Sequence, residues 1–234
     1  MNKILIATNN KGKVEELQNL LNDTGFQLLI PADIHLDLDV IEDGLTYVEN
    51  ATKKAIAFAQ ASNLISLADD SGLEVDALNG EPGLYSARYG SIDGKKLSDG
   101  ERRKYLLSKL QQYPRPWTAR FKATIAVAVP AHVTLSETKG LFQSQPETLG
   151  SPAKNSITSS RRPFGRVSHV EGICEGEIIP EERGTGGFGY DPIFLFPELG
   201  KTMSELGTDE KNRLSHRAKA VMKAKEALKS LFND

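Results

Sequence analysis

The sequence predicts an α/β protein built around a mixed sheet, and three observations lead to this fold class. Residues 3–8 form a short apolar run that is typical of a buried strand, and residues 11–23 follow with apolar side chains at helical spacing. The same two signals recur, in the order helix then strand, over residues 44–63 and 64–69. Residues 120–129 alternate with a period of two, which predicts a strand with one buried face. Helices and strands therefore intermix along the chain, and no internal repeat is present.

Each expected helix has a side-chain stripe or a capping signal of its own. The first two stripes consist of Val14, Leu17, Leu20 and Leu21, and of Leu45, Val48, Ala51, Ala55 and Ala59. A third helix is expected at the capping box formed by Ser98 and Glu101, ahead of "RRKYLLSKLQQ". The last helix is expected to start at Ser215, with Val221, Ala224, Leu228 and Leu231 on its buried stripe.

The remaining extended segments follow from apolar runs and alternation. The strand over residues 64–69 ends in "DDSG", where Ser71 and Gly72 are expected to turn the chain. Further extended pieces are expected over residues 169–179, "HVEGICEGEII", and residues 190–196, "YDPIFLF".

Composition narrows the class of protein. The 29 Lys and Arg against 31 Asp and Glu give no net basic character, which argues against a nucleic-acid partner. The single cysteine, Cys174, excludes an intramolecular disulfide and a cysteine-rich zinc cage. The N-terminal apolar run is too short for a signal peptide, and no run approaches the ~20 apolar residues of a membrane span. We therefore expect a cytoplasmic protein without a membrane partner.

One segment departs from this periodic pattern. Residues 131–168 are rich in Ser, Thr, Pro and Gln and carry few apolar side chains. Such a segment has little apolar surface to offset the entropy lost on ordering. We expect a long loop or extended hairpin inserted into the domain, whose basic "SSRRPFGR" stretch is more simply a solvated run than a partner site.

Two helix starts carry cations where the helix dipole favours anions. Lys11 and Lys13 in "ATNNKGK", and His216 and Arg217 in "SHRAKA", each occupy a first turn. A bound phosphate or another acceptor would compensate for these cations. The alternative is solvated side chains at a surface turn, which costs only a few tenths of a kcal/mol per residue.

Two further motifs each allow a functional and a structural interpretation. "GTGGFGYDP" lets the backbone approach a ligand, with Phe188 available for stacking, or it is a glycine-rich turn with a core phenylalanine. Asp69 and Asp70 offer carboxylates that bind Mg²⁺ or activate water, or they belong to a polar turn. Because adjacent strand residues point to opposite faces, the two aspartates are expected to have different roles.

Together, "TNNKGKVEEL", "ADDSGLEVDALNGEPGLYSARY", "GTGGFGYDPIF" and "SHRAKA" closely resemble, in sequence and in order, the inosine triphosphate pyrophosphatase family. The resemblance implies an elongated α/β fold with a long twisted mixed sheet, and an active-site cleft between two lobes of one domain over residues 1–234. It also implies hydrolysis of ITP, dITP and XTP to the nucleoside monophosphate and pyrophosphate, with Mg²⁺ as cofactor, by a homodimer.

The resemblance assigns site residues by motif. The segment that would cradle the triphosphate consists of Thr8, Asn9, Asn10, Lys11, Gly12 and Lys13. Asp70 would activate the attacking water and bind metal with Glu42, Lys54 would contact phosphate, and Ser71 would touch the substrate. The wall for the base would consist of Phe188, which stacks on the purine, and Gly189, Tyr190 and Asp191; Lys211, His216 and Arg217 would line the base pocket.

The residue chemistry accounts for a preference for deaminated purines. Donors on His216 and Arg217 match the 6-keto group of hypoxanthine or xanthine, whereas the 6-amino group of adenine would leave a donor unpaired, at about 1–3 kcal/mol.

One departure, one uncertain position and three alternative functions stay open at this point. Residues 131–168 are longer than the connection that the family pattern leads us to expect, and Lys53 beside Lys54 allows a one-residue error. The alternative functions are a pyrophosphatase of the same fold for other modified nucleotides, and a nucleotide-binding sensor without turnover. An interaction module that works through the long loop is the weakest alternative.

Overall fold

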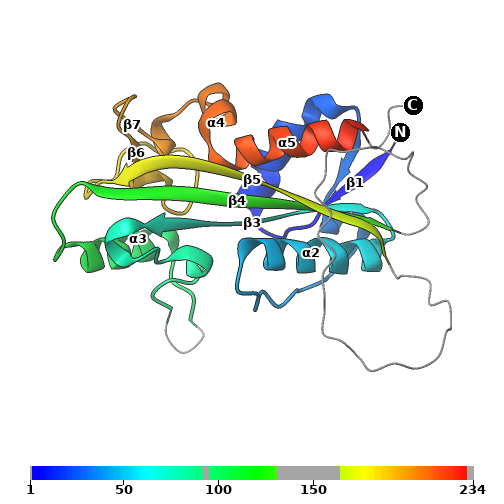
Figure 1. Ribbon diagram of the computed structural model, residues 1–234, viewed down its shortest axis with the longest axis horizontal. Coiled ribbons are helices and arrows are strands. Elements are labelled where there is room, and N and C mark those ends of the chain that lie inside the picture. Colours follow the sequence, from blue (N-terminus) through cyan, green and yellow to red (C-terminus); the bar gives the residue numbers. More distant parts are fainter. Residues whose placement is uncertain (1, 92–94, 131–163, 231–234) are drawn as a thin grey trace, which may run out of the picture.

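The protein is described by a computed structural model over residues 2–91, 95–130 and 164–230. Within these residues the strands form one open seven-stranded sheet in the order β2-β1-β3-β4-β5-β6-β7 (Figure 1). The strands are β1 (Lys3–Ile6), β2 (Gln27–Leu29), β3 (Ile65–Val75), β4 (Trp117–Pro130), β5 (Phe164–Ile178), β6 (Phe194–Phe196) and β7 (Lys201–Thr202). β1 is parallel to β2 and β3, and the other pairs are antiparallel, so the sheet is mixed as predicted.

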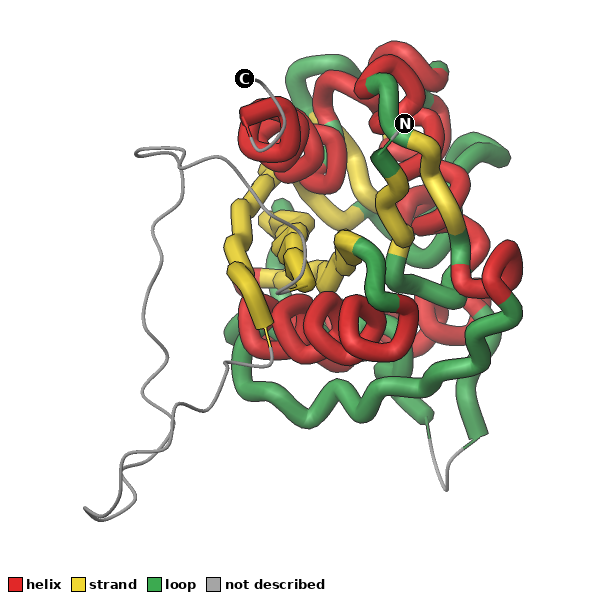
Figure 2. The backbone as a smooth tube through the Cα atoms, turned by 90° about the vertical axis from the view of Figure 1, so that its right-hand side faces the viewer, coloured by secondary structure: helices red, strands yellow, loops and turns green. Residues whose placement is uncertain are grey.

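The helices of the described residues cover both faces of this sheet. They are α1 (Lys11–Leu21), α2 (Tyr47–Ser62), α3 (Asp99–Leu110), α4 (Thr208–Leu214) and α5 (His216–Ser230), with short 3₁₀ turns between them. α5 packs on β4 and β5 on one face, and α2 packs on β3 and β4 on the other (Figures 1 and 2). In the described residues none of these helices combines the length and the apolar character needed to cross a bilayer.

The core divides into two lobes along the long strands. In one lobe, buried residues of β1, α1 and α5 form a cluster on one face of the sheet, and buried alanines of α2 and β4 form a second cluster on the opposite face. In the other lobe, α3 packs with the far ends of β3, β4 and β5 around Phe121 and Phe194. The elongated shape in Figure 1 follows because β3, β4 and β5 run through both lobes.

Several local predictions are confirmed. Ser98 caps α3, and Glu101 completes the capping box with a 2.8 Å bond to the Ser98 amide. The helical stripe of α1 is buried at Leu17, Leu20 and Leu21. In β4 the alternating residues from Ala123 to Val129 join the cluster under α5.

Four expectations about element boundaries are wrong. "DDSG" does not end a strand: β3 continues to Val75, because Asp69, Asp70 and Ser71 pair with Ile125, Thr124 and Ala123 of β4.

The second helix begins at Tyr47 rather than at residue 44, since Thr46 is its N-cap and Leu45 is 86% exposed. The segment over residues 190–196 contains a 3₁₀ turn, Asp191–Ile193, before β6. Residues 164–168 of the predicted insertion belong to β5, and the rest of that prediction, residues 131–163, lies outside the described residues together with Leu231.

Candidate active site

A cleft opens where β1 ends and leaves one edge of β3 free. β1 pairs with β3 only at Ile65, Ser66 and Leu67. Beyond Leu67, no strand of the described residues pairs with β3 on that side, and the next bridge on this edge is the isolated one between Glu74 and Pro82. Side chains from both faces of β3 therefore reach one cavity of about 390 Å³, lined by Asp70 from one face and by Ser71 from the other.

Nearly all residues singled out from the sequence line this cavity. They are Thr8, Asn10, Lys11, Gly12, Lys13, Glu42, Lys54, Asp70, Ser71, Phe188, Gly189, Tyr190, Asp191, Lys211, His216 and Arg217. Asn9 is the exception, since its side chain donates to the Leu38 carbonyl at 3.4 Å instead. Asn10 caps α1 by accepting from the Lys13 amide at 3.1 Å.

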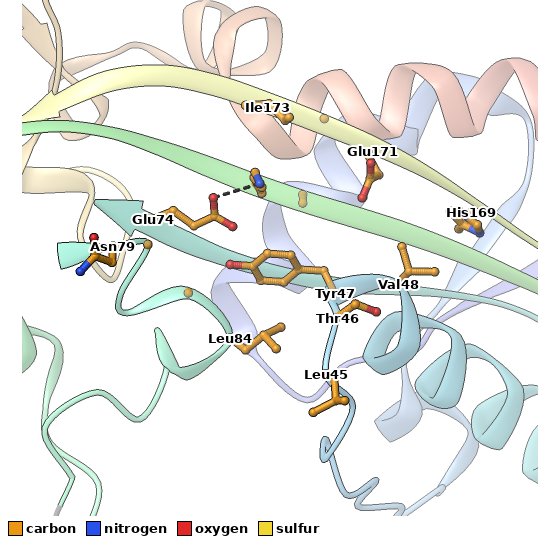
Figure 3. Close-up of a pocket in the computed structure, with 15 residues that line it drawn as sticks. Leu45, Thr46, Tyr47, Val48, Glu74, Asn79, Leu84, His169, Glu171 and Ile173 are labelled. Carbon is orange, nitrogen blue, oxygen red and sulfur yellow. Dashed lines mark ion pairs between the residues drawn. The ribbon is translucent and has the colours of Figure 1, made fainter. Parts of the chain in front are cut away.

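A larger hollow on the α2 face of the sheet does not contain this chemistry. It measures about 970 Å³ and lies between the start of α2, the Gly83–Leu84 turn and strands β3 to β5 (Figure 3). Its ion pair joins Glu74 to Lys122 at 2.9 Å, beside the ring of Tyr47. None of the residues predicted for substrate or metal lines this hollow, so size alone does not locate the site.

Asp69 and Arg217 form a buried ion pair at the base of the cleft. Arg217 donates from Nε and Nη2 to Asp69 Oδ2 at 3.2 and 3.1 Å, and from Nη2 to Ser71 Oγ at 3.0 Å. Arg217 also pairs through Nη1 with Glu16 of α1. Burial opposes both charges, but the attraction outweighs it, so the pKa of Asp69 is lowered and that of Arg217 is raised. This network joins α1, β3 and α5 into one wall.

Two lysines approach the Asp69–Asp70 segment from different helices. Lys13 Nζ lies 2.9 Å from Asp69 Oδ2 and donates to the Asp69 carbonyl at 3.3 Å. Lys54 Nζ donates to the same carbonyl at 2.7 Å and pairs with Glu42 at 2.9 Å. Burial is the main cause that lowers the pKa of Lys13, with the nearby cations Lys54 and Arg217 adding to it against the pull of Asp69. These ammonium groups face a cavity in which an anion would relieve their mutual repulsion.

Asp70 differs from its neighbour because its carboxylate is poorly compensated. Its Oδ1 lies 3.7 Å from Lys54 Nζ, beyond hydrogen-bond distance. Its Oδ2 is buried without a hydrogen-bond partner in the part of the chain that the structure describes. Burial raises the pKa of Asp70, and the negative charges of Glu42 and Asp69 add to the effect while Lys54 opposes it. The two aspartates thus have different environments, as their opposite orientations predicted.

An aromatic ring of the glycine-rich motif packs against the start of α1. A Cβ built on Gly12 would lie 2.6 Å from the Phe188 ring, so only glycine permits this approach. The Arg217 guanidinium and the Lys211 ammonium lie 5.6 and 5.8 Å from the centre of the same ring. Lys211 in turn bonds to Asp191 at 2.8 Å and to Glu16 at 2.6 Å. The glycine-rich motif therefore presents its aromatic ring at the cleft rather than in the core.

His216 enters the cleft as a neutral ring. It stacks on Phe121 with centroids 4.7 Å apart, and its Nδ1 lies 3.9 Å from the Cys174 sulfur. Burial, reinforced by the Arg217 charge, lowers the pKa of His216 to about 3. The sequence predicts charged donors at both His216 and Arg217. The neutral imidazole instead offers one N–H, and the Arg217 fork is largely engaged by carboxylates.

Several residues of the site were missed in the sequence. They are Glu16, Gly72, Leu84, Ser86, Ala87, Arg88, Asp99, Arg102 and Phe121. Glu16 had a usable signal, because it lies three residues after Lys13 and so shares a helix face with it. Arg88 lies within "LYSARY" but has no spacing signal of its own. Asp99 and Arg102 of α3 had no signal in the sequence, because their neighbours in the cleft are distant along the chain.

Fold and site define an open α/β protein whose cleft gathers opposite charges at the free edge of a central strand. The sequence profile of the Ham1 family matches residues 4–151 and 154–227. The chain belongs to the Ham1 family.

Similar proteins agree with this assignment over nearly the whole chain. A dITP/XTP pyrophosphatase of Desulforamulus reducens is 42% identical over 231 residues, covering 98% of this chain and 97% of the relative. The Bacillus subtilis dITP/XTP pyrophosphatase is 38% identical, with 98% of each chain covered. The solved HAM1 protein of Coxiella burnetii matches with a TM-score of 0.74 at 33% identity, covering 98% of this chain and 99% of that one. The Staphylococcus aureus Ham1 protein matches with a TM-score of 0.72 at 34% identity, covering 97% and 98%. The family resemblance carried by the four motifs is confirmed.

Proposed function

We propose that the protein hydrolyses non-standard purine nucleoside triphosphates, namely ITP, dITP and XTP, to the nucleoside monophosphate and pyrophosphate. The observation that carries the proposal is the placement of Asp70. Its unpartnered carboxylate oxygen lies in a cleft that also holds Lys13, Lys54 and the Phe188 ring. The names of the related dITP/XTP pyrophosphatases support dITP and XTP as substrates.

The charges of the cleft suit a polyphosphate that brings additional positive charge with it. Of the described residues, seven basic and five acidic side chains line the cavity. Asp69 lies beneath them and offsets one more cation. This small excess does not neutralise a triphosphate. A metal cation is therefore part of the proposal.

Glu42 and Asp70 fit the requirements of Mg²⁺. Among the described residues the Oδ2 of Asp70 has no hydrogen-bond partner and can serve as an oxygen ligand. Glu42 Oε1 pairs with Lys54, the lysine that also lies next to Asp70. No group of three or more His, Cys, Asp or Glu side chains converges as a cage within the described residues. This agrees with Mg²⁺, which usually takes one or two carboxylates and completes its shell with phosphate and water. When bound, the ion supplies positive charge that neutralises phosphate oxygens.

The protein side chains supply positioning and a proton acceptor. The phosphates are bound by Lys11, Lys13 and the first-turn amides of α1. Lys54 holds the phosphate group that lies next to Asp70. Asp70 accepts a proton from water as the water oxygen attacks phosphorus; the α–β bridging bond breaks and pyrophosphate leaves. Asp70 suits this role because its side chain lines the cleft and one of its carboxylate oxygens has no hydrogen-bond partner among the described residues.

The base pocket selects by hydrogen bonding. The neutral His216 N–H and the remaining Arg217 N–H match the 6-keto group of hypoxanthine or xanthine. Adenine places a donor there and leaves buried donors unpaired, which costs about 1–3 kcal/mol, or roughly tenfold to hundredfold in rate. Phe188 stacks on the ring of the purine. We propose further that the whole chain works as one two-lobed domain, as a homodimer in the cytoplasm.

The test is pyrophosphate release from ITP, XTP, GTP and ATP in parallel, with Mg²⁺ and with chelator. Mg²⁺-dependent release from ITP and XTP, with little from GTP and ATP, supports both the reaction and the pocket. Orthophosphate in place of pyrophosphate would contradict the cleavage site. Tight ITP binding without turnover would favour a sensor, and turnover of modified pyrimidine nucleotides alone would favour the related pyrophosphatase. Light scattering on the same sample tests the dimer.

A further inference from the structure

The loop that carries Phe188 fixes Phe188 itself through Asp191, whose Oδ2 accepts from the Phe188 amide at 3.1 Å and whose amide donates to the Phe188 carbonyl at 3.2 Å. Within the described residues, the bonds of the loop do not extend to the next residue, Gly189. Gly184, Gly187 and Gly189 have positive φ values of 82°, 74° and 62°, a region open mainly to glycine. A Cβ on Gly189 would meet nothing within 4 Å, so no packing confines this residue from outside. Glycine has more backbone freedom to lose on ordering than any other residue. Gly189 therefore depends on contacts from outside the loop to stay in place.

That support comes from α3, which forms another part of the cleft wall. Asp99 Oδ2 accepts from the Gly189 amide at 2.6 Å, and Arg103 Nη1 donates to the Gly189 carbonyl at 2.8 Å. Asp99 and Arg103 are four residues apart and so lie on one face of the helix. Together they bond to both polar groups of the residue that follows Phe188. Both bonds involve a charged side chain, which makes them stronger than neutral ones.

Arg103 bonds to the Gly189 carbonyl although Arg103 itself does not line the cleft. Its second nitrogen, Nη2, pairs with Glu182 at 2.7 Å, away from the cavity. Asp99 also pairs with Arg102, a cleft residue. Tyr190 extends the same support, since its hydroxyl donates to the Ser86 carbonyl at 3.0 Å.

We propose that Asp99 and Arg103 are positioning residues that hold Gly189 and thereby set the place of the Phe188 ring in the nucleoside part of the cleft. The proposal rests on the proposed function for its substrate. The phosphate-binding side chains belong to α1 and α2, and neither helix contacts Gly189 through these bonds. Loss of the support therefore weakens recognition of the nucleoside and leaves recognition of the phosphates unchanged.

The test compares Arg103→Met with Arg103→Lys, using Glu182→Gln as the matched control. Arg103→Met removes the bond to Gly189 and keeps the length of the side chain. We expect the KM for ITP to rise about tenfold, as for a lost charge-assisted bond, with kcat changed less than about twofold. The inhibition constant of inorganic tripolyphosphate, which has no nucleoside, stays unchanged. Arg103→Lys restores part of the KM, and Glu182→Gln leaves KM within about twofold, because a half-exposed ion pair contributes little.

A second readout does not depend on activity. Hydrogen exchange of the peptide spanning residues 184–191 becomes faster in Arg103→Met, and the core of β4 keeps its protection. Unchanged exchange and unchanged KM would overturn the proposal, and so would an equal rise of KM and of the tripolyphosphate constant. If the unmodified protein does not hydrolyse ITP, the proposed function fails, whereas the exchange experiment still decides whether α3 holds Gly189.

Discussion

Replacing each of the two adjacent aspartates by asparagine separates structure from catalysis. The substitutions Asp69→Asn and Asp70→Asn are chemically identical and nearly isosteric. We expect the first to destabilise the fold and the second to abolish turnover while the protein stays folded. The difference follows from the partners of the two carboxylates rather than from their position in the chain.

The magnitudes come from the contacts. Asp69 is 0% exposed and compensates Lys13 at 2.9 Å and Arg217 at 3.1 Å. Removing one partner of such a buried pair costs about 3–5 kcal/mol, because the remaining charge stays buried. For a chain of this length that lowers Tm by about 10 °C. Asp70 has one free oxygen and a lysine only at 3.7 Å, so its neutral replacement changes the free energy of unfolding by less than about 1 kcal/mol.

The assay is thermal unfolding at several pH values beside pyrophosphate release. The pKa of Asp69 is lowered by folding, so its stabilisation is present above the unfolded pKa and is lost as the pH falls toward the folded value. The pKa of Asp70 is raised, so its ionisation costs stability at neutral pH, and acid removes this cost. Wild-type stability in Asp69→Asn, or turnover within tenfold of wild type in Asp70→Asn, would refute the reasoning.

Three further predictions concern other parts of the cleft and its walls. The pKa of His216 is lowered to about 3, so we expect its ring to stay neutral in an NMR titration from pH 8 to pH 5. Below pH 6 the unfolded chain binds a proton at this histidine that the folded chain does not. The free energy of unfolding therefore falls by up to about 1.4 kcal/mol for each unit of pH. Gly172→Ala places a Cβ 2.1 Å from the His216 carbonyl oxygen and lowers the free energy of unfolding by about 3 kcal/mol in denaturant titration, whereas no change would show that α5 shifts without cost. Asn10→Ala loses a helix cap and costs about 1 kcal/mol, whereas Asn9→Ala, with an exposed side chain, stays within about 0.5 kcal/mol; equal losses in chemical unfolding would contradict the cap assignment.

Elements set by local signals could be predicted from the sequence. Ser98 and Glu101 marked the start of α3, and the alternation in β4 identified the face that packs under α5. The burial of the opposite face at Ala126 and Ala128 was not predicted. A similar signal was overlooked at α2, where Thr46 accepts from the Glu49 amide and Glu49 accepts from the Leu45 amide. That T-x-x-E pattern would have placed the helix start correctly.

The course of β3 could not be predicted from local signals. "DDSG" has the composition of a turn, but its pairing with β4 decides its conformation, and β4 lies more than 50 residues away. The charge that makes Asp69 tolerable inside a strand comes from Arg217, which is 148 residues distant. The same limit applies to Asp99 and Arg103, whose partner Gly189 lies 90 and 86 residues away. Motifs indicated which residues matter, whereas the supports between motifs depend on tertiary contacts.

The two aspartates at the free edge of β3 depend on the register of this strand for the face of the sheet on which each one lies. Because side chains alternate between faces, a deletion or insertion of one residue before Asp69 would move each carboxylate to the opposite side of the sheet. The aspartate that now neutralises Arg217 would then face Lys54 and Glu42, and its neighbour would be buried against α5. Length changes are therefore tolerated far less in β3 than substitutions, and variation in the length of this protein is expected in its loops instead.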